Sequence, residues 1–402
     1  MSDAHGVVAR GTPPPGSTDV LSLVVGNQSL TGWQRVSVAR PLAAIPASFQ
    51  IETTERYPNA PTIGLEAGQE CTVMIGNDLV LTGYVDRYAS SISAGNHTVR
   101  IEGRSRSCDL VDCSALVQNT AAGSPSTQGM QVLNGDAVSI ARTLAAPYNV
   151  QINTNAEGPF QAIPQLNINL GETVWQIIDR ITRYSELLAY DMPDGSVMLA
   201  RVGDGSMASG FTLGANLEQA DIMFSMDQRY SEYEGHLLSN MALGTDAGVN
   251  TPTIGQIVRD DEVPRFRKLY IVSEQTINVQ PIAGLRAVWE KNRRWGQSFA
   301  FSVTCDSWRD ASGALWAPNM LAPVNAPQLK VDPSKSWIIG NVTYTRDESG
   351  QHAHVGLWPK EAFTVEPDSP NYFMTQEAVN RYNPTSTNPD AGRPPATGTP
   401  QV

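Results

Sequence analysis

The chain has 402 residues, with 28 basic and 40 acidic side chains and a formal net charge of −12. This length predicts about two to four domains, since one domain usually takes about 100–200 residues. The acidic balance argues against a nucleic-acid-binding surface over most of the molecule, because neutralising phosphates requires Lys and Arg. The hydrophobic content of 41% excludes a mostly disordered chain. No apolar run reaches the roughly 18 residues that a membrane-spanning helix needs.

Both ends of the sequence are poor in aliphatic residues. Residues 1–18 contain Pro13-Pro14-Pro15, and residues 366–402 combine many prolines with Thr, Asn and Gly. Such segments bury too little apolar area to offset the entropy lost on ordering. We therefore expect a flexible N-terminal arm at 1–18 and a Pro/Thr-rich C-terminal tail at 366–402. The first residues show no basic stretch followed by an apolar run, so no signal peptide is expected.

Residues 19–118 predict a first β-barrel domain. Short apolar or alternating segments are separated by turn residues, and no long helical periodicity interrupts them. The expected strands are Val20–Val25, Trp33–Val38, Phe49–Ile51, Cys71–Ile75, Leu79–Arg87 and His97–Glu102. About six short strands in about 100 residues are typical of a small antiparallel barrel that is closed or nearly closed.

Residues 119–217 predict an α+β domain. The segment Asp136–Ala146 has helical periodicity and is followed by a proline. The spacing Thr173–Gln176 fits a capping box ahead of an apolar stripe, which predicts an amphipathic helix over residues 174–189. The dipeptide Asp194-Gly195 then predicts a hairpin turn between two short strands.

A second set of strands follows. It begins at Ile222–Leu237 and resumes after a helix predicted at Ile282–Arg294, with strands expected at Phe299–Val303, Gln328–Val331, Trp337–Tyr344 and His352–Leu357. This order predicts a second β-barrel domain made of residues 218–238 and 298–365, interrupted by a helix-containing insertion at 239–297. The expected fold is therefore mainly β, with two small antiparallel β-barrel domains and α+β insertion modules.

The sequence contains no catalytic motif of adequate specificity, such as a nucleophile elbow, a zinc-protease motif or a phosphate-binding loop. His352 and His354 lie two apart in an expected strand, so both side chains point to one face, but two ligands alone make a poor metal site. Two of the chain's carboxylates could form the acid–base pair of a glycosidase, but the sequence does not give the distance between two carboxyl groups, which is what matters for that chemistry. The candidates are Glu55, Asp86, Asp179, Asp306 and Asp310.

Three further residue groups favour structural roles. A predicted helix carries the basic run Arg286, Lys291, Arg293 and Arg294, and a solvated face explains it better than phosphate binding. The tryptophans near the C-terminal end of the chain suit a core or a subunit interface better than a surface that stacks on sugar rings. They are Trp289, Trp295, Trp308, Trp316, Trp337 and Trp358. Reduced thiols are expected at Cys71, Cys108, Cys113 and Cys305. We therefore predict a protein that is not an enzyme, with no catalytic, metal or cofactor residues.

Two groups of short segments share order and spacing with a known family. In the first β region these are Asp86, Gly103–Ser105 and Asp109–Asp112. A longer run lies towards the C-terminus: Arg286–Glu290, Arg293-Arg294, Ser302–Thr304, Trp308, Gly313–Trp316, Pro318-Asn319, Ile338-Ile339, Val342–Tyr344, Gly350, Leu357–Pro359 and Ala362-Phe363. Together they cover about residues 20–365. In this pattern the chain resembles the baseplate central hub proteins of contractile phage tails, specifically the Mu-like tail protein P family.

The resemblance implies a non-catalytic virion protein of the tail baseplate, assembled in the host cytoplasm. It implies a homotrimer in which two similar β-barrels per subunit surround a channel with pseudo-sixfold symmetry. Such a ring joins the hexameric tail tube to the trimeric membrane-piercing spike and lets DNA pass. The implied partners are the trimeric tail spike protein, the tail tube or tube-initiator protein and the baseplate wedge proteins. No cofactor, specific nucleic-acid binding or membrane insertion is implied.

Two other classes of function stay open at this point. A carbohydrate-binding adhesin or tail-tip protein of a non-contractile phage would have a similar all-β composition. A glycan hydrolase is the third reading. The arrangement of copies separates the first two, because a hub lies as a trimer on the tail axis and an adhesin lies at the periphery. An assay on peptidoglycan tests the third.

Overall fold

The computed structural model describes residues 19–54, 65–94, 96–116, 126–128, 130–203, 205–238, 253–274, 282–332 and 334–368. The first part of the chain forms seven strands among these residues. They are β1 (Leu21–Val25), β2 (Gln28–Leu30), β3 (Arg35–Pro41), β4 (Ser48–Thr54), β5 (Glu70–Ile75), β6 (Asp78–Ser93) and β7 (Asn96–Ser105). Among the described residues, no helix combines the length and apolar character needed to cross a bilayer.

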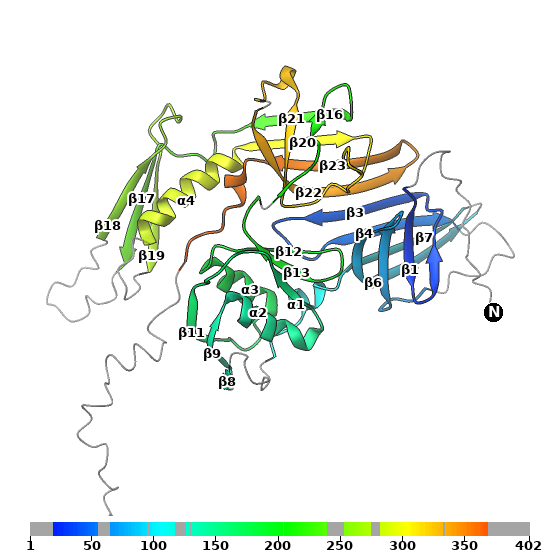
Figure 1. Ribbon diagram of the computed structural model, residues 1–402, viewed down its shortest axis with the longest axis horizontal. Helices are drawn as coiled ribbons and strands as arrows, with labels where there is room; N and C mark the ends of the chain where they lie inside the picture. Colours follow the sequence, from blue (N-terminus) through cyan, green and yellow to red (C-terminus); the bar gives the residue numbers. More distant parts are fainter. Residues whose placement is uncertain are drawn as a thin grey trace, which may run out of the picture.

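A second set of strands comes from the later part of the chain. These are β14 (Gly205–Ser206), β15 (Phe211–Thr212), β16 (Leu217–Phe224), β20 (Phe299–Cys305), β21 (Met320–Asn325), β22 (Ser336–Asp347) and β23 (Gly350–Trp358). Both sets belong to one 14-stranded sheet with the order β16-β20-β23-β22-β3-β4-β7-β6-β5-β1-β2, and β14, β15 and β21 attach beside this path (Figure 1). The sheet curls, and the expectation of a mainly β fold is confirmed.

The two strand sets meet where β22 pairs with β3. The pairing is antiparallel and runs from Asn341 opposite Pro41 to Arg346 opposite Val36. Apolar residues of both sets then form one continuous core, which contains Val38, Phe49 and Ile101 from the first set and Phe301, Tyr344 and Val355 from the second. Alternation along each strand places one side chain in two against this core. The other side chains lie on the opposite face of the sheet.

The two strand sets repeat one topology. The order β3-β4-β7-β6-β5 has the same chain connectivity as β16-β20-β23-β22-β21, and every neighbouring pair in both runs is antiparallel. A bulge interrupts β6 between Val85 and Arg87, and another interrupts β22 between Ile339 and Asn341. From each bulge to the hairpin end, Arg87–Ser93 and Asn341–Asp347 have equal length. The register therefore matches residue by residue.

An α+β module lies between the two strand sets in the chain. It contains α1 (Cys108–Asp112), β8 (Ser126–Gln128), β9 (Gln131–Asp136), α2 (Ala137–Ala145), η1 (Ala146–Tyr148), β10 (Ile152–Thr154), β11 (Ala162–Asn167), α3 (Val174–Arg183), β12 (Leu188–Asp191) and β13 (Val197–Ala200). These elements enclose a separate apolar core. The predicted capping box is present, with the Thr173 hydroxyl accepting from the Gln176 N–H at 3.3 Å.

Helix α3 is shorter than the predicted span 174–189. Its last helical residue is Arg183, because Glu186 adopts a left-handed conformation with φ 51° and the Leu187 N–H turns back to the Thr182 carbonyl. The next residue already belongs to β12. The apolar residue Leu188 matches the helical stripe, but it pairs with Ala200 in the hairpin.

A smaller module contains β17 (Glu232–Leu238), β18 (Thr253–Arg259), β19 (Lys268–Glu274) and α4 (Ile282–Gln297), followed later by η4 (Lys360–Phe363). β17 lies within 218–238, which we assigned to the second barrel, yet it pairs with β18 and β19 and packs against α4. Arg229 lies in the segment between β16 and β17 and donates two hydrogen bonds to the carboxylate of Asp260. Both side chains are buried. Gly235 is necessary there, since a Cβ would meet the Ala283 carbonyl oxygen of α4 at 2.3 Å.

One predicted strand is absent. Residues Gln328–Val331 do not join the sheet, because Pro327–Leu329 form the 3-10 helix η3 and Lys330 has a positive φ of 57°. The strand position beside β22 is taken by β21, earlier in the chain. Proline at the start of the segment favours a helical turn over a ladder that needs its N–H.

Asp191 fastens the α+β module to the first strand set. It stands at the end of β12, and its Oδ2 accepts hydrogen bonds from the Ala47 N–H at 2.5 Å and from the Ser105 hydroxyl at 2.5 Å. Burial raises the pKa of Asp191, although hydrogen bonds from Ser105, Ser107 and Ala47 act in the opposite direction. One buried carboxylate thus satisfies polar groups from the β3–β4 loop and from β7.

We expect Asp191→Ala to lower the free energy of unfolding by about 1–3 kcal/mol, since the Ala47 N–H and Ser105 hydroxyl lose their acceptor. Asp191→Asn keeps an oxygen acceptor and should cost less. Because the folded pKa is raised, wild-type stability should fall as the pH rises from the unfolded pKa through the folded pKa, and the Asn variant should lack this component. Urea unfolding at several pH values measures both effects. Equal losses in the two variants would contradict the role assigned to Asp191.

Candidate functional site: the polar face of the curled sheet

The face of the sheet opposite the core carries polar side chains across both strand sets. We call this surface the polar sheet face and define it by Arg35, Ser37, Gln50, Glu52, Asp86, Arg87, Arg100, Glu102, Arg104, Asp221, Ser302, Thr304, Thr343 and His354. It has two shallow depressions of about 680 and 660 Å³. Ser37 and Gln50 line the first, and the topologically matching residues Asp221 and Ser302 line the second.

Charged side chains in the first half of this face are paired with one another. Arg100 Nε lies 2.7 Å from Glu102 Oε1, and Arg87 Nη1 lies 3.4 Å from Glu102 Oε2. Arg104 contacts Asp86 and, at 2.8 Å, Asp112 of α1. Pairs of this partly exposed kind contribute about 0–1 kcal/mol each. Their main effect is a polar surface with little net charge.

The second half of the face is largely uncharged. The side chains of Thr304 and His354 meet at 3.1 Å across β20 and β23. His352 lies on the same face, as predicted, and its Nδ1 is 2.9 Å from Glu218 Oε2. Within the part of the chain that the structure describes, no group of three or more His, Cys, Asp or Glu is placed to hold a metal ion. His354 thus belongs to the polar sheet face, and His352 lies beside it on the same side of β23.

The carboxylates considered as an acid–base pair are dispersed over different elements. Asp86 binds Arg104 on β7, and Asp179 lies 2.6 Å from Arg183 in the same helix. Asp310 accepts the Ala208 N–H at 2.9 Å and the Ala314 N–H at 3.0 Å, so it shapes a loop. Asp306 follows β20, and Glu55 lies outside the described residues. Asp86, Asp179 and Asp310 therefore have local structural roles.

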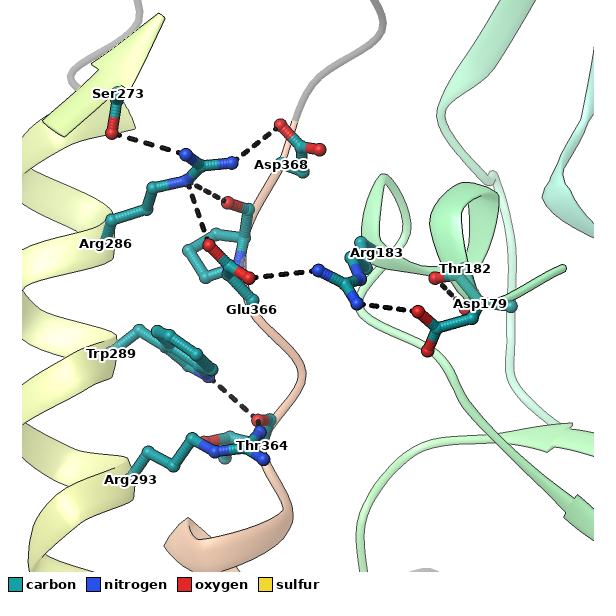
Figure 2. A network of polar contacts seen from close by, with 11 residues as sticks. Asp179, Thr182, Arg183, Ser273, Arg286, Trp289, Arg293, Thr364, Glu366 and Asp368 are labelled. Carbon is teal, nitrogen blue, oxygen red and sulfur yellow. Dashed lines mark hydrogen bonds and ion pairs between the residues drawn. The ribbon is translucent and has the colours of Figure 1, made fainter. Parts of the chain in front are cut away.

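The basic run on α4 faces a strap formed by residues 364–368, not solvent alone. Arg286 contacts Glu366 at 3.5 Å and Asp368 at 3.0 Å, and Trp289 donates its indole N–H to the Thr364 carbonyl at 2.8 Å. Figure 2 shows that Glu366 also reaches Arg183 of α3, at 3.1 Å. The strap thus joins α4 to the α+β module.

The remaining basic residues of this helix have nearby partners. The Arg293 guanidinium lies 5.2 Å from the centre of the Trp289 ring and donates to the Thr364 carbonyl at 3.4 Å (Figure 2). Arg294 pairs with Glu290 at 2.7 Å. Lys291 is partly exposed. The prediction of a solvated face is wrong for Arg286 and Arg293, because the strap packs against both side chains. The local sequence of the helix does not reveal this distant segment.

The tryptophans and cysteines mostly belong to the core. Trp308 and Trp316 are fully buried, and their indole N–H groups donate to backbone carbonyls at 2.9 Å and 3.0 Å. All four cysteines are free thiols, as expected. Burial raises the pKa of Cys71, Cys108 and Cys305 to about 12, which keeps these thiols protonated and unreactive at neutral pH.

Three family models match successive parts of the chain. They describe the N-terminal domain of the Mu phage baseplate assembly protein GpP-like family (residues 20–105), the second domain of the gp44-like baseplate hub protein (107–201) and the fourth domain of GpP (280–366). The baseplate hub protein gp44 of Escherichia phage Mu is 27% identical over 357 residues, which is 88% of this chain and 91% of that protein. The chain thus carries domains that match the baseplate hub family models, and it is a homologue of the Mu hub protein over most of its length.

Solved structures of tail proteins share the fold of this chain. The 43 kDa tail protein of prophage MuSo2 from Shewanella oneidensis has a TM-score of 0.73 and 26% identity, covering 86% of this chain and 100% of that one. The tail protein from Neisseria meningitidis MC58 has a TM-score of 0.70 and 20% identity, covering 87% and 98%. The resemblance stated from sequence is therefore confirmed for the family.

The polar sheet face could not be identified from the sequence. The signal was present as the polar half of each alternating strand, for example Ser37 beside Val36 and Val38. Alternation gives the two faces of one strand, but not which distant strand lies next to it. The pairing of β22 with β3 makes the two polar halves continuous.

We expect Glu366→Gln to loosen the strap, since it removes ion pairs to Arg183 and Arg286. The free energy of unfolding should change by at most about 1–2 kcal/mol, because both pairs are partly exposed. Hydrogen exchange of a peptide covering residues 360–368 should become faster. The control Glu348→Gln changes an exposed turn between β22 and β23. Unchanged exchange in Glu366→Gln would show that the strap does not depend on these ion pairs.

Proposed function

We propose that this chain is the central baseplate hub of a Mu-like contractile phage tail. In this role it forms a homotrimeric ring that joins the hexameric tail tube to the trimeric membrane-piercing spike. The observation that carries the proposal is the repeated strand order of the two sets, in a chain of the Mu-like hub family. Two equivalent units per chain turn threefold symmetry into near-sixfold symmetry, which is what a hexameric tube requires of its partner.

The proposed channel wall is the polar sheet face. This surface spans both strand sets and carries no long apolar stretch, as a wall in contact with water and DNA requires. Its charges nearly balance: the basic residues are Arg35, Arg87, Arg100 and Arg104, and the acidic ones are Glu52, Asp86, Glu102 and Asp221. Adhesion to duplex DNA depends on unpaired Lys and Arg. A wall of paired charges lets DNA pass without retaining it.

The other modules lie outside this ring in our proposal. The basic residues of α4 lie away from the wall in this proposal: Arg286, Lys291, Arg293 and Arg294. In support, Arg286 and Arg293 contact the strap, and Arg294 contacts Glu290. The barrel regions face the tube, whereas the α+β module and the α4 module are available to the spike and to baseplate wedge proteins. We assign no catalytic step to the protein, and its location is the tail baseplate of the virion after assembly in the host cytoplasm.

We further propose a domain division that follows from these roles. It assigns β1 to β7 to the first barrel and α1 to β13 to the α+β domain, in place of the expected boundaries at residues 118 and 217. The second barrel begins with β14 and continues to β16, and the insertion then extends from β17 to α4. The arm at 1–18 and the tail at 366–402 complete the chain, with the start of the tail held as the strap.

The purified protein is expected to form a trimer. Light scattering of the protein alone should give three times the 43.4 kDa mass of one chain, and a complex with the spike protein should contain three copies of the chain. A cryo-EM map of the tail tip should place the two strand sets against the tube. A map with residues 130–215 against the tube, or with the chain as peripheral copies, would contradict the hub assignment.

The trimer is expected to show no measurable binding to duplex DNA at micromolar concentration in low salt. The reason is that the basic side chains of the polar sheet face are already paired with carboxylates, and the net charge of −12 per chain repels phosphate. A fluorescence anisotropy titration with a short duplex measures this. Replacing Glu102 with Gln removes the ion pair of Arg87 and leaves Arg100 only its 3.9 Å contact with Glu52, so it should increase binding. Glu348→Gln serves as the charge-matched control.

A further inference from the structure

A cavity of about 350 Å³ lies where the α+β module, helix α4 and the strap meet. Its walls come from α3, from the start of β12, from α4 and from residues 362–366. Figure 2 shows this junction, with Trp289 and Arg293 extending from α4 towards the strap and Arg183 approaching from α3. The cavity shares no lining residue with the two depressions of the polar sheet face. Cavities of this size between modules are common places for ligands to bind.

Four charged side chains line the cavity, and three of them satisfy one another. Arg183 lies 2.6 Å from Asp179 and 3.1 Å from Glu366. Arg293 is the exception, because its guanidinium donates a single hydrogen bond, at 3.4 Å, to the Thr364 carbonyl. Among the described residues, no carboxylate forms an ion pair with Arg293. The cavity therefore contains one cation whose charge is not matched by a direct partner.

Burial makes this guanidinium costly to keep charged without a partner. Desolvation lowers the pKa of Arg293, and the carboxylates of Glu290 and Glu366 oppose this effect only in part. A guanidinium has five N–H donors in a planar fork that fits both oxygens of a carboxylate. The ring of Trp289 lies 5.2 Å from the guanidinium and helps to fix its orientation. A carboxylate that enters the cavity would complete the pairing of Arg293.

The rest of the cavity wall is largely apolar. It includes the partly exposed side chains of Trp175, Leu188, Trp289, Phe363 and Val365. Such a wall favours an apolar group next to the anion. One water molecule takes about 30 Å³ in the liquid, so the cavity has room for a group of roughly ten non-hydrogen atoms. The C-terminal residue of a peptide supplies a carboxylate and a side chain within about this size.

We propose that this cavity binds the C-terminal residue of a partner protein, with the terminal carboxylate paired to Arg293 and an apolar last side chain against the tryptophans. The inference goes beyond the hub function proposed above and does not depend on the trimer. Charge complementarity carries it, since an unpaired guanidinium faces an otherwise apolar cavity. The bound terminus would contact α3, α4 and the strap together, and would thereby stiffen the junction between the α+β module and the α4 module.

Peptide binding to the full-length protein tests this site. The probe is the tripeptide Ac-Gly-Gly-Phe with a free C-terminal carboxylate, and its matched control is the same peptide with a C-terminal amide. Isothermal titration calorimetry measures both affinities. We expect saturable binding of the free acid, with an affinity at least about tenfold higher than that of the amide. A hydrogen bond to a charged group accounts for a factor of this size.

Three variants locate the site. Arg293→Gln removes the charge and should abolish the preference for the free acid. Its matched control is Arg294→Gln on the same helix, because Arg294 pairs with Glu290 and does not line the cavity. Ala43→Trp should weaken the binding of both peptides, since Ala43 is an exposed residue of the cavity wall and a large ring there occupies the space.

Equal affinity for the two peptides, or no saturable binding of either, would overturn the proposed site. A preference for the free acid that persists in folded Arg293→Gln would overturn the role of Arg293. Unchanged binding in Ala43→Trp would place the peptide elsewhere on the protein, and this variant decides the question if Arg293→Gln fails to fold. None of these results changes the hub proposal, which the tail-tip map tests separately.

Discussion

The antiparallel pairing of β22 with β3 is the contact on which the architecture depends. Without it the chain would hold two separate curled sheets, each with an additional exposed edge. With it, residues from Leu21 to Leu357 share one apolar core and the two polar halves form one continuous face. The pairing joins segments about 300 residues apart. Closing so long a loop costs conformational entropy, and the apolar area buried along both strands offsets this cost.

The two strand sets have the same topology and similar core residues, but different polar side chains. Core positions keep apolar residues of similar shape, as at Phe49 and Phe301 or at Ile51 and Val303. Positions on the polar sheet face have diverged, with Gln50 matched by Ser302 and Arg100 by His354. Packing restricts the inner side of each strand, whereas the outer side needs only to be polar. In the proposed ring, such repeats would give similar curvature throughout and a wall whose charge varies between halves.

The modules around the sheet are held by polar contacts at a few defined points. Asp191 joins the α+β module to the β3–β4 loop and to β7, and Glu366 joins α3 to α4. Arg309 crosses between the strand sets, contacting Asp19 at 2.7 Å and Asp78 at 2.5 Å. Directional contacts of this kind fix orientation more than they add stability. Among the described residues, these modules leave the polar sheet face uncovered, as the proposed wall requires.

The sequence by itself determined the mainly β class, the capping box at Thr173 and the helices near Ala137 and Ile282, because these depend on neighbours within a few residues. It also carried the family pattern and the polar half of each strand. Only the tertiary structure decided that β17 leaves the second strand set, that residues 328–331 are not a strand and that Arg286 binds the strap. Strand partners and ion pairs depend on segments distant in the chain. A side-chain period of two specifies the face of a strand but leaves its neighbour undetermined.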